Sequence, residues 1–316
     1  MSKVRVCFLG TPEFAVTSLR ALIEDEHFEI VGVVTQPDRP SGRKMQLTPS
    51  PVKVLAEARG LRVISPESLR KDPSQLEEIK KWGAEVAVVV AFGQILTQAF
   101  LDLFPFGAVN VHGSILPRWR GAAPIQRGIE AGDKESGVTL QRVVKKLDAG
   151  DIIGTRRVPL DDEITAVELH DQLAVLGADL LQVELMDFVR GNLAPHPQDE
   201  SQVTHAAKID KAESEIQWRL PAVEIHNKVR ALTMGPGTFT TFAGKKIKIH
   251  KTRVLEESGA NPDPGKITSV TQEFISVQTG GGILNLLELQ PESRTRMKVA
   301  EFLKGHPLKI GDRFGV

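Results

Sequence analysis

The sequence predicts an α/β domain built on a largely parallel sheet, followed by a smaller β-barrel domain. With 316 residues, 41% of them hydrophobic, the chain is long enough to bury two cores. In the first half, apolar runs rich in β-branched residues alternate with stretches of helical periodicity, which is typical of βα units. In the last third, short strand-like runs are separated by Gly, Asn and Pro, which favours a small barrel.

The first half is expected to form a Rossmann-like domain. Its expected strands are Val4–Leu9, Ile30–Thr35, Glu85–Ala91 and Ala108–Val111, and its expected helices are Glu13–Glu24, Pro51–Ala58 and Ser68–Trp82. The run Val86–Ala91 has no polar residue at either parity, as a central strand covered on both faces requires. Further strands of the same sheet are expected at Val138–Val143 and Ile152–Val158, followed by a long helix from about Ala166 to Val189.

A polar, proline-bearing stretch from Gly191 has the composition of an interdomain linker. We therefore predict a first domain over residues 1–190, a linker over 191–207 and an OB-like domain over 208–316. The second domain should contain one helix, Ala222–Leu232, and the strands Thr238–Phe242, Lys245–Val254, Gly265–Ser269, Ile275–Gln278 and Ile283–Leu289.

The charge is zero overall but unevenly distributed. From Lys208 to Val316 there are 17 basic and 12 acidic residues, which makes the C-terminal third net basic and modestly favours a polyanionic partner. The single cysteine, Cys7, lies in an apolar run, so we expect a buried thiol and no intrachain disulfide. No run approaches membrane-spanning length, and a strand begins almost at once. We therefore expect a cytoplasmic protein.

The glycine and histidine patterns argue against several cofactors. The loop Gly10–Phe14 has one glycine, whereas a dinucleotide fingerprint needs three and a P-loop needs Gly-Lys-Ser/Thr. The simpler interpretation is a strand-to-helix turn with Pro12 near the helix start. The eight histidines are scattered without metal-ligand spacing, so no metal is expected.

Asn110 and His112 are candidates for chemistry because they lie at the end of the expected strand Ala108–Val111. Open α/β sheets bind ligands at that edge, and period-two spacing points both side chains the same way. An amide donor beside an imidazole can stabilise an oxyanion and move a proton, as acyl transfer requires. Asp148 could orient His112 and accept a proton through water. From spacing alone, a structural histidine and an ordinary Asp/Gly turn remain open.

Six segments together resemble one family over essentially the whole chain: Phe8–Ala15, Thr35–Arg43, Pro49–Ala56, Asn110–Gln126, Leu147–Asp151 and Asn285–Pro291. They resemble the folate-dependent formyltransferases. The run Arg118–Gln126, the proline-rich loop and the C-terminal match narrow the resemblance to the methionyl-tRNA formyltransferases. The resemblance implies 10-formyltetrahydrofolate as the formyl donor and the α-amine of initiator methionyl-tRNA as the acceptor.

The resemblance also assigns roles to single residues. Asn110, His112 and Asp148 match the catalytic trio of the family. The folate-binding stretch of the family corresponds to Ser114, Ile115, Leu116 and Pro117, and the wall of its pterin pocket includes Phe92 and Gly93. Phe92 stands where a tyrosine is expected, which removes a phenol and keeps an aromatic face.

Two basic segments are candidates for RNA contacts. Residues 36–51 contain four prolines and no periodicity, which predicts an exposed loop. The resemblance implies that this loop enters the tRNA acceptor end, with Arg39, Arg43 and Lys44 as its basic residues. In Lys245–Arg253 the alternate residues Lys246, Lys248, His250 and Thr252 would share one face of a strand, suited to tracking phosphate. A solvated basic lid and a solvated β-face are the alternative interpretations.

Three hypotheses follow for the function. The first is formyl transfer from folate to initiator methionyl-tRNA. The second is another folate-dependent formyl transfer, to glycinamide ribotide or an amino-sugar nucleotide, although neither acceptor needs the basic loop or a basic second domain. The third is an inactive RNA-binding relative, against which the intact trio argues. One catalytic and one RNA-binding domain suffice for a monomer, which is the state we expect.

Overall fold

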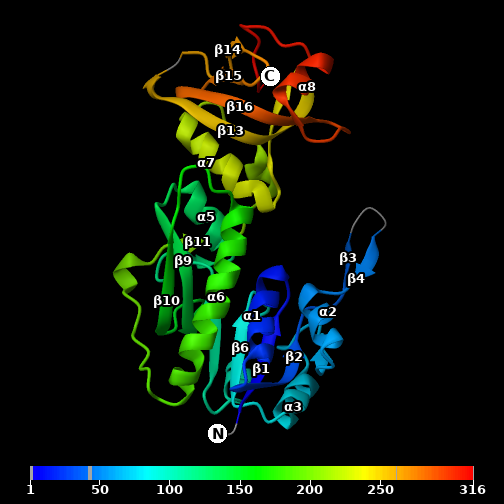
Figure 1. Ribbon diagram of the computed structural model, residues 1–316, viewed down its shortest axis with the longest axis vertical. Coiled ribbons are helices and arrows are strands. Elements are labelled where there is room, and N and C mark those ends of the chain that lie inside the picture. The colour runs from blue at the N-terminus through cyan, green and yellow to red at the C-terminus, as the bar shows by residue number, and fades with distance from the viewer. Residues whose placement is uncertain (1–2, 42–44, 261, 316) are drawn as a thin grey trace. The chain divides into compact units, whose positions relative to one another are not determined.

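The computed structural model describes residues 3–41, 45–260 and 262–315, which form two compact units (Figure 1). Unit 1 comprises the residues up to Pro124, Glu135–Val158 and His170–Ala206, and unit 2 comprises Ile125–Lys134, Pro159–Leu169 and the chain from Ala207 onward. Two segments from the predicted first domain are therefore grouped with unit 2, which the sequence does not indicate. The domain limits 1–190 and 208–316 stay a prediction.

A seven-stranded sheet in the order β10-β9-β7-β6-β1-β2-β5 forms the centre of unit 1. Its strands are β1 (Val4–Gly10), β2 (Phe28–Val34), β5 (Val63–Ile64), β6 (Val86–Val90), β7 (Ala108–His112), β9 (Glu135–Arg142) and β10 (Ile152–Pro159). The five adjacent strands β7, β6, β1, β2 and β5 pair in parallel, and β9 runs antiparallel to β7. The largely parallel sheet predicted from the sequence is confirmed.

Helices cover both faces of this sheet. They are α1 (Glu13–Glu24), α2 (Pro51–Ala58), α3 (Pro73–Lys81), α4 (Gln98–Leu101) and α6 (Ala166–Val189). On one face, Ile79 of α3 and Phe100 of α4 pack in an apolar cluster that includes Cys7. On the other face α6 approaches β7 so closely that a Cβ on Gly177 would lie 2.8 Å from a Val111 methyl group. The buried cysteine is confirmed, and burial raises the pKa of its thiol.

Helix α3 begins at Pro73, later than the predicted start at Ser68. The Asp72 carboxylate accepts the backbone N–H of Ser74, and proline occupies the first turn, where its missing N–H costs nothing. Capping by a side chain therefore decides where this helix starts, whereas apolar periodicity alone extends it too far.

In the described part of unit 1, four short strands lie outside the seven-stranded sheet. Strand β3 (Arg39–Ser41) pairs antiparallel with β4 (Gln46–Thr48) as an exposed hairpin within the proline-rich loop, whereas Ser50 near the end of that loop is buried. Strand β8 (Arg120–Gly121) pairs in parallel with β11 (His205–Ala206). The β8–β11 pair attaches residues 205–206, which lie in the predicted linker, to the rest of unit 1.

Unit 2 is built on an antiparallel sheet in the order β12-β13-β16-β15-β14, with β17 paired to β16. Its strands are β12 (Thr238–Phe242), β13 (Lys245–Ala260), β14 (Ile267–Val270), β15 (Ile275–Gln278), β16 (Gly281–Pro291) and β17 (Met297–Lys298). Its helices are α7 (Ala222–Ala231), α8 (Val299–Gly305) and most of α5 (Pro124–Glu130). The predicted separate strand-rich domain is confirmed.

The C-terminal residues 312–315 join the two outer strands of this sheet. The Gly315 N–H donates to the Thr241 carbonyl of β12 at 2.8 Å, and the Ile267 N–H of β14 donates to the Asp312 carbonyl at 2.8 Å. The sheet is thereby connected from edge to edge, as a barrel requires. Among the described residues, no helix combines the length and apolar character needed to cross a bilayer.

His226 of α7 is buried in unit 2 with both ring nitrogens engaged. Nε2 donates to the Asp162 carbonyl at 2.7 Å, and the Thr252 hydroxyl lies 2.9 Å from Nδ1, to which it donates. Burial lowers the pKa of His226, and this effect outweighs the opposing effects of the Asp162 carbonyl and the Glu163 carboxylate.

Unit 2 should therefore lose stability on acidification. The unfolded chain takes up a proton on this histidine near pH 6.5, whereas the folded chain keeps it neutral to lower pH, so the free energy of unfolding falls below about pH 6.5. Urea denaturation between about pH 7.5 and pH 5 should show a weaker pH dependence for His226→Gln than for the wild type. His205→Gln, a change at an exposed histidine, is the control. Equal slopes for His226→Gln and the wild type would contradict the prediction.

Candidate active site

Asn110 and His112 lie near the carboxyl end of β7, where the parallel strands of an open sheet form their ligand crevice. The β7–β9 register places Asn110 opposite Gln141 and His112 opposite Thr139. Residues directly opposite in an antiparallel pair point to the same face, so one face carries four polar side chains. The Asn110 amide is partly exposed there, and His112 is 6% exposed.

Two neighbours fix the His112 imidazole. Nε2 lies 2.9 Å from the Trp119 carbonyl oxygen, and because a carbonyl only accepts, Nε2 carries a proton. Nδ1 faces the Asp148 carboxylate, with 3.8 Å between Nδ1 and Oδ2. That separation exceeds a hydrogen bond, so Nδ1 is the ring nitrogen that can reach a substrate.

Asp148 is held on both carboxylate oxygens in the turn between β9 and β10. Oδ2 accepts the Gly121 N–H at 2.9 Å, and Oδ1 accepts from Gln141 Nε2 at 3.2 Å. The backbone of Asp148 has φ +49°, a left-handed conformation that aspartate tolerates better than most residues. The structure therefore brings all three residues of the predicted trio together.

Gln141 and Gly121 also orient the carboxylate, and neither was predicted from the sequence as a site residue. Gln141 lies in the expected strand Val138–Val143, in which Thr139 and Arg142 are also polar, and it is only 1% exposed. A buried amide in such a run needs hydrogen-bond partners, and here one of them is Asp148.

The stretch after β7 that matches the folate-binding residues is fixed by Thr139. The Thr139 hydroxyl donates to the Ser114 carbonyl at 2.7 Å and accepts the Leu116 N–H at 3.1 Å. Ser114 and Leu116 are buried, whereas Ile115 and Pro117 are partly exposed. Ile115 and Pro117 therefore offer the side-chain surface that a ligand here can contact.

A pocket of about 390 Å³ lies at the carboxyl ends of β1, β2 and β6, and its lining includes Gln36, Phe92 and Gly93. The Phe92 ring is 2% exposed and packs in the apolar cluster beneath the sheet. Its backbone carbonyl accepts from the Gln36 amide at 3.0 Å. Phe92 and Gly93 both line this pocket, and Gly93 is exposed there.

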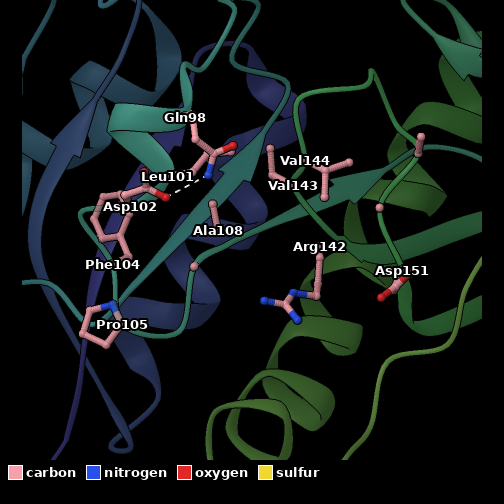
Figure 2. A pocket seen from close by; sticks show the side chains of 13 residues that line it. Gln98, Leu101, Asp102, Phe104, Pro105, Ala108, Arg142, Val143, Val144 and Asp151 are labelled. Atoms are coloured by element: carbon pink, nitrogen blue, oxygen red, sulfur yellow. Dashed lines mark hydrogen bonds between the residues drawn. The ribbon is translucent and has the colours of Figure 1, made fainter.

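Figure 2 shows a larger pocket, of about 630 Å³, near the amino end of β7. Arg142, Asp102 and Asp151 supply its charged groups, and the Gln98 amide donates to Asp102 at 2.8 Å. No member of the trio lines it, so pocket size does not identify the reacting centre here. Among the described residues, no cluster of three or more His, Cys, Asp or Glu side chains could hold a metal ion.

The candidates for RNA contact are distributed over both units. Arg39 lies in the exposed hairpin and pairs with Glu67 at 3.2 Å. Arg43 and Lys44 lie outside the described residues. In unit 2 the Lys246 ammonium lies 3.4 Å from the centre of the Phe239 ring, and Lys248 is exposed on β13.

The predicted basic face of β13 holds only in the first part of the strand. Ile249 is buried as the alternation predicts, but the register with β16 is irregular between Ile249 and Thr252. Such an irregularity exchanges the two faces, so Thr252 is buried and the neighbouring Lys251 and Arg253 are exposed. The prediction that Thr252 shares the basic face was wrong for this reason.

Comparison with known proteins gives two family matches. Residues 3–184 match the formyl transferase family model, and residues 208–307 match the formyl transferase C-terminal domain model. The chain is 68% identical to the methionyl-tRNA formyltransferase of Bdellovibrio bacteriovorus, with 100% of both chains covered. It is 43% identical to the methionyl-tRNA formyltransferase of Symbiobacterium thermophilum, covering 98% of this chain and 95% of the relative.

Two solved structures share the fold. One is the N-formyltransferase from Helicobacter canadensis in complex with folinic acid and dTDP-3-aminofucose, with a TM-score of 0.68, 20% identity and coverage of 91% of this chain and 99% of that one. The other is WlaRD, a sugar 3N-formyl transferase crystallised with dTDP and 5-N-formyl-THF. Its TM-score is 0.67 at 19% identity, with coverage of 93% and 100%.

Proposed function

The chain belongs to the formyl transferase family, and on this premise we propose that it formylates the α-amine of methionine on initiator tRNA. The observation that carries the proposal is the 68% identity, over both full lengths, to a methionyl-tRNA formyltransferase. The formyl donor is 10-formyltetrahydrofolate. The product is formylmethionyl-tRNA for translation initiation, so the proposal places the enzyme in the cytoplasm.

Asn110 and His112 stabilise the charge that develops during transfer. When the neutral amine attacks the formyl carbon, negative charge accumulates on the formyl oxygen. The Asn110 amide and the Nδ1–H of a protonated His112 donate to that oxygen. Nδ1 fills this role because Nε2 already donates to the Trp119 carbonyl.

Asp148 completes the reaction by favouring the charged imidazole and by taking a proton from the amine through a water molecule. Its carboxylate faces Nδ1 at 3.8 Å, which supports the first role. The bond between the formyl carbon and folate N10 then breaks, N10 leaves and takes up a proton, and the formyl carbon remains bonded to the methionine nitrogen.

The folate lies at the same edge of the sheet in this proposal. Ser114 and Leu116 shape the stretch through their backbone bonds to Thr139, while Ile115 and Pro117 provide contact surface. Phe92 and Gly93 bound the pterin side of the site, where the neighbouring pocket offers space. The folinic acid in the related Helicobacter canadensis structure supports a tetrahydrofolate-type donor.

The RNA contacts of the proposal come from the hairpin and from unit 2. Arg39, Arg43 and Lys44 contact the acceptor end, and Lys246 and Lys248 contact phosphate. The basic excess of the C-terminal third supports this assignment. One chain carries the trio, the folate edge and both basic segments, so the proposed active species is a monomer.

The proposed acceptor is tested by formyl transfer from 10-formyltetrahydrofolate to charged initiator tRNA. Elongator methionyl-tRNA, glycinamide ribotide and an amino-sugar nucleotide serve as competing acceptors in parallel reactions. We expect rapid formylation of the initiator alone. Preferential use of glycinamide ribotide or the amino-sugar nucleotide would assign the chain to the other folate-dependent enzymes, and no turnover with any acceptor would indicate an inactive relative.

His112→Ala should lower the single-turnover rate about 100- to 1000-fold, because one oxyanion donor is lost. His27→Ala, a change at an exposed histidine that pairs with Asp25, is the control and should keep the wild-type rate. A near-normal rate for His112→Ala would remove His112 from the mechanism.

Arg43→Glu should raise the KM for tRNA and leave the KM for folate unchanged, since the proposal gives this residue only an RNA contact. The salt dependence of tRNA binding should weaken by about one unit of slope. Arg59→Glu reverses a charge that pairs with Glu24 outside the hairpin and is the matched control. An unchanged tRNA profile in Arg43→Glu would refute the assignment.

A further inference from the structure

A short segment between the two family matches forms hydrogen bonds to both loops of the candidate active site, the loop after β7 and the turn between β9 and β10. We call residues 196–206 the strap. The family matches end at residue 184 and resume at 208, so neither covers it. The strap belongs to unit 1 and contains β11, whose partner β8 lies in the loop after β7. It is therefore built into the catalytic unit.

The strap first fixes the loop that orients His112. The Thr204 hydroxyl accepts the Trp119 N–H at 2.9 Å, and the Thr204 carbonyl accepts the Arg120 N–H at 2.9 Å. Trp119 supplies the carbonyl that receives Nε2–H, and the following Gly121 supplies an N–H to the catalytic carboxylate. The strap thus holds the backbone groups that orient two members of the trio.

Gln198 of the strap then joins this loop to the turn that carries Asp148. Its Nε2 donates to the Asp148 carbonyl at 2.8 Å and to the Gly150 carbonyl at 2.7 Å. Its Oε1 accepts from Nε and Nη2 of Arg120 at 3.0 and 2.8 Å. Because carbonyls only accept and a guanidinium only donates, these partners fix the orientation of the amide.

The partners of Gln198 are themselves rigid. Arg120 is 2% exposed, so its guanidinium has little freedom to follow a displaced amide. At Gly150 a Cβ would lie 1.8 Å from the Arg142 carbonyl, which shows how tightly the turn packs. Asp148 has the left-handed φ of +49°, an uncommon conformation for a residue other than glycine, and the bonds from Gln198 hold the turn that contains it.

Glu200, at the surface, also connects the loop after β7 to the turn that carries Asp148. Its carboxylate accepts from Arg120 Nη2 at 2.8 Å and from Lys146 Nζ at 2.7 Å, and Lys146 precedes Asp148 in the turn. The hydrogen bonds from Arg120 and Lys146 lower the pKa of Glu200 to about 2. The strap therefore connects the two loops at more than one point.

We propose that Gln198 is a positioning residue for the reaction: by donating to the Asp148 and Gly150 carbonyls it sets the approach of the Asp148 carboxylate to His112. The inference rests on the proposed roles of these two residues. Gln198 acts through Asp148 and contacts neither substrate.

Gln198→Glu tests the proposal because it keeps an acceptor for Arg120 and replaces the donor by an oxygen facing two carbonyls. We expect kcat to fall about 10- to 100-fold, as a misplaced catalytic group costs, with the KM for folate and tRNA changed by less than about twofold. Gln198→Ala removes the donor without adding charge and should show the same division between kcat and KM.

Gln202→Glu is the matched control. It makes the same chemical change within the strap, where the Gln202 amide donates to Asp199 at 2.9 Å. Its kcat should equal that of the wild type. Normal kcat in Gln198→Ala, or a loss confined to KM or to the midpoint of thermal denaturation, would overturn the proposal.

A double-mutant cycle shows whether Gln198 acts through Asp148. In an Asp148→Asn background, Gln198→Glu should cause no further loss of the single-turnover rate. An equal loss in both backgrounds would overturn the positioning role. Wild-type activity of Asp148→Asn alone would instead refute the proposed catalytic trio, so the two failures are distinguishable.

Discussion

The antiparallel pairing of β9 with β7 is the constraint on which the candidate site depends. Its register puts Thr139 and Gln141 on the face that carries Asn110 and His112. Thr139 then fixes the stretch after β7, and Gln141 holds the Asp148 carboxylate. A slip of one residue would move both side chains to the opposite face, which is why a single register decides so much of the site.

The two ring nitrogens of His112 have different partners. The Trp119 carbonyl binds Nε2–H and fixes the ring, and Nδ1 faces the Asp148 carboxylate. His112 is almost fully buried, so water competes little with these contacts. Donors held in place before the reaction stabilise developing charge without paying for reorganisation. In the proposed mechanism, the backbone groups around His112 therefore contribute to the reaction.

Local patterns predicted the strands and helices well where burial alone decides them. Helix α2, β12 and β15 have the predicted bounds, and the trio suggested by the family resemblance lies together. The differences arise where a tertiary contact or a side-chain hydrogen bond intervenes. Asp72 caps α3 and delays its start, and an irregular register turns Thr252 inward.

Amino-acid composition could not predict the structural role of the strap. A stretch rich in Pro, Gln, Asp and Ser has the same composition whether water or protein satisfies its polar groups. The Gln202 amide bonds to Asp199 in its own turn, whereas Gln198 bonds to Arg120 and to the turn that carries Asp148. The two residues have identical side chains, and only their partners differ. A polar segment between domains therefore cannot be assigned as a linker until the destination of each hydrogen bond is known.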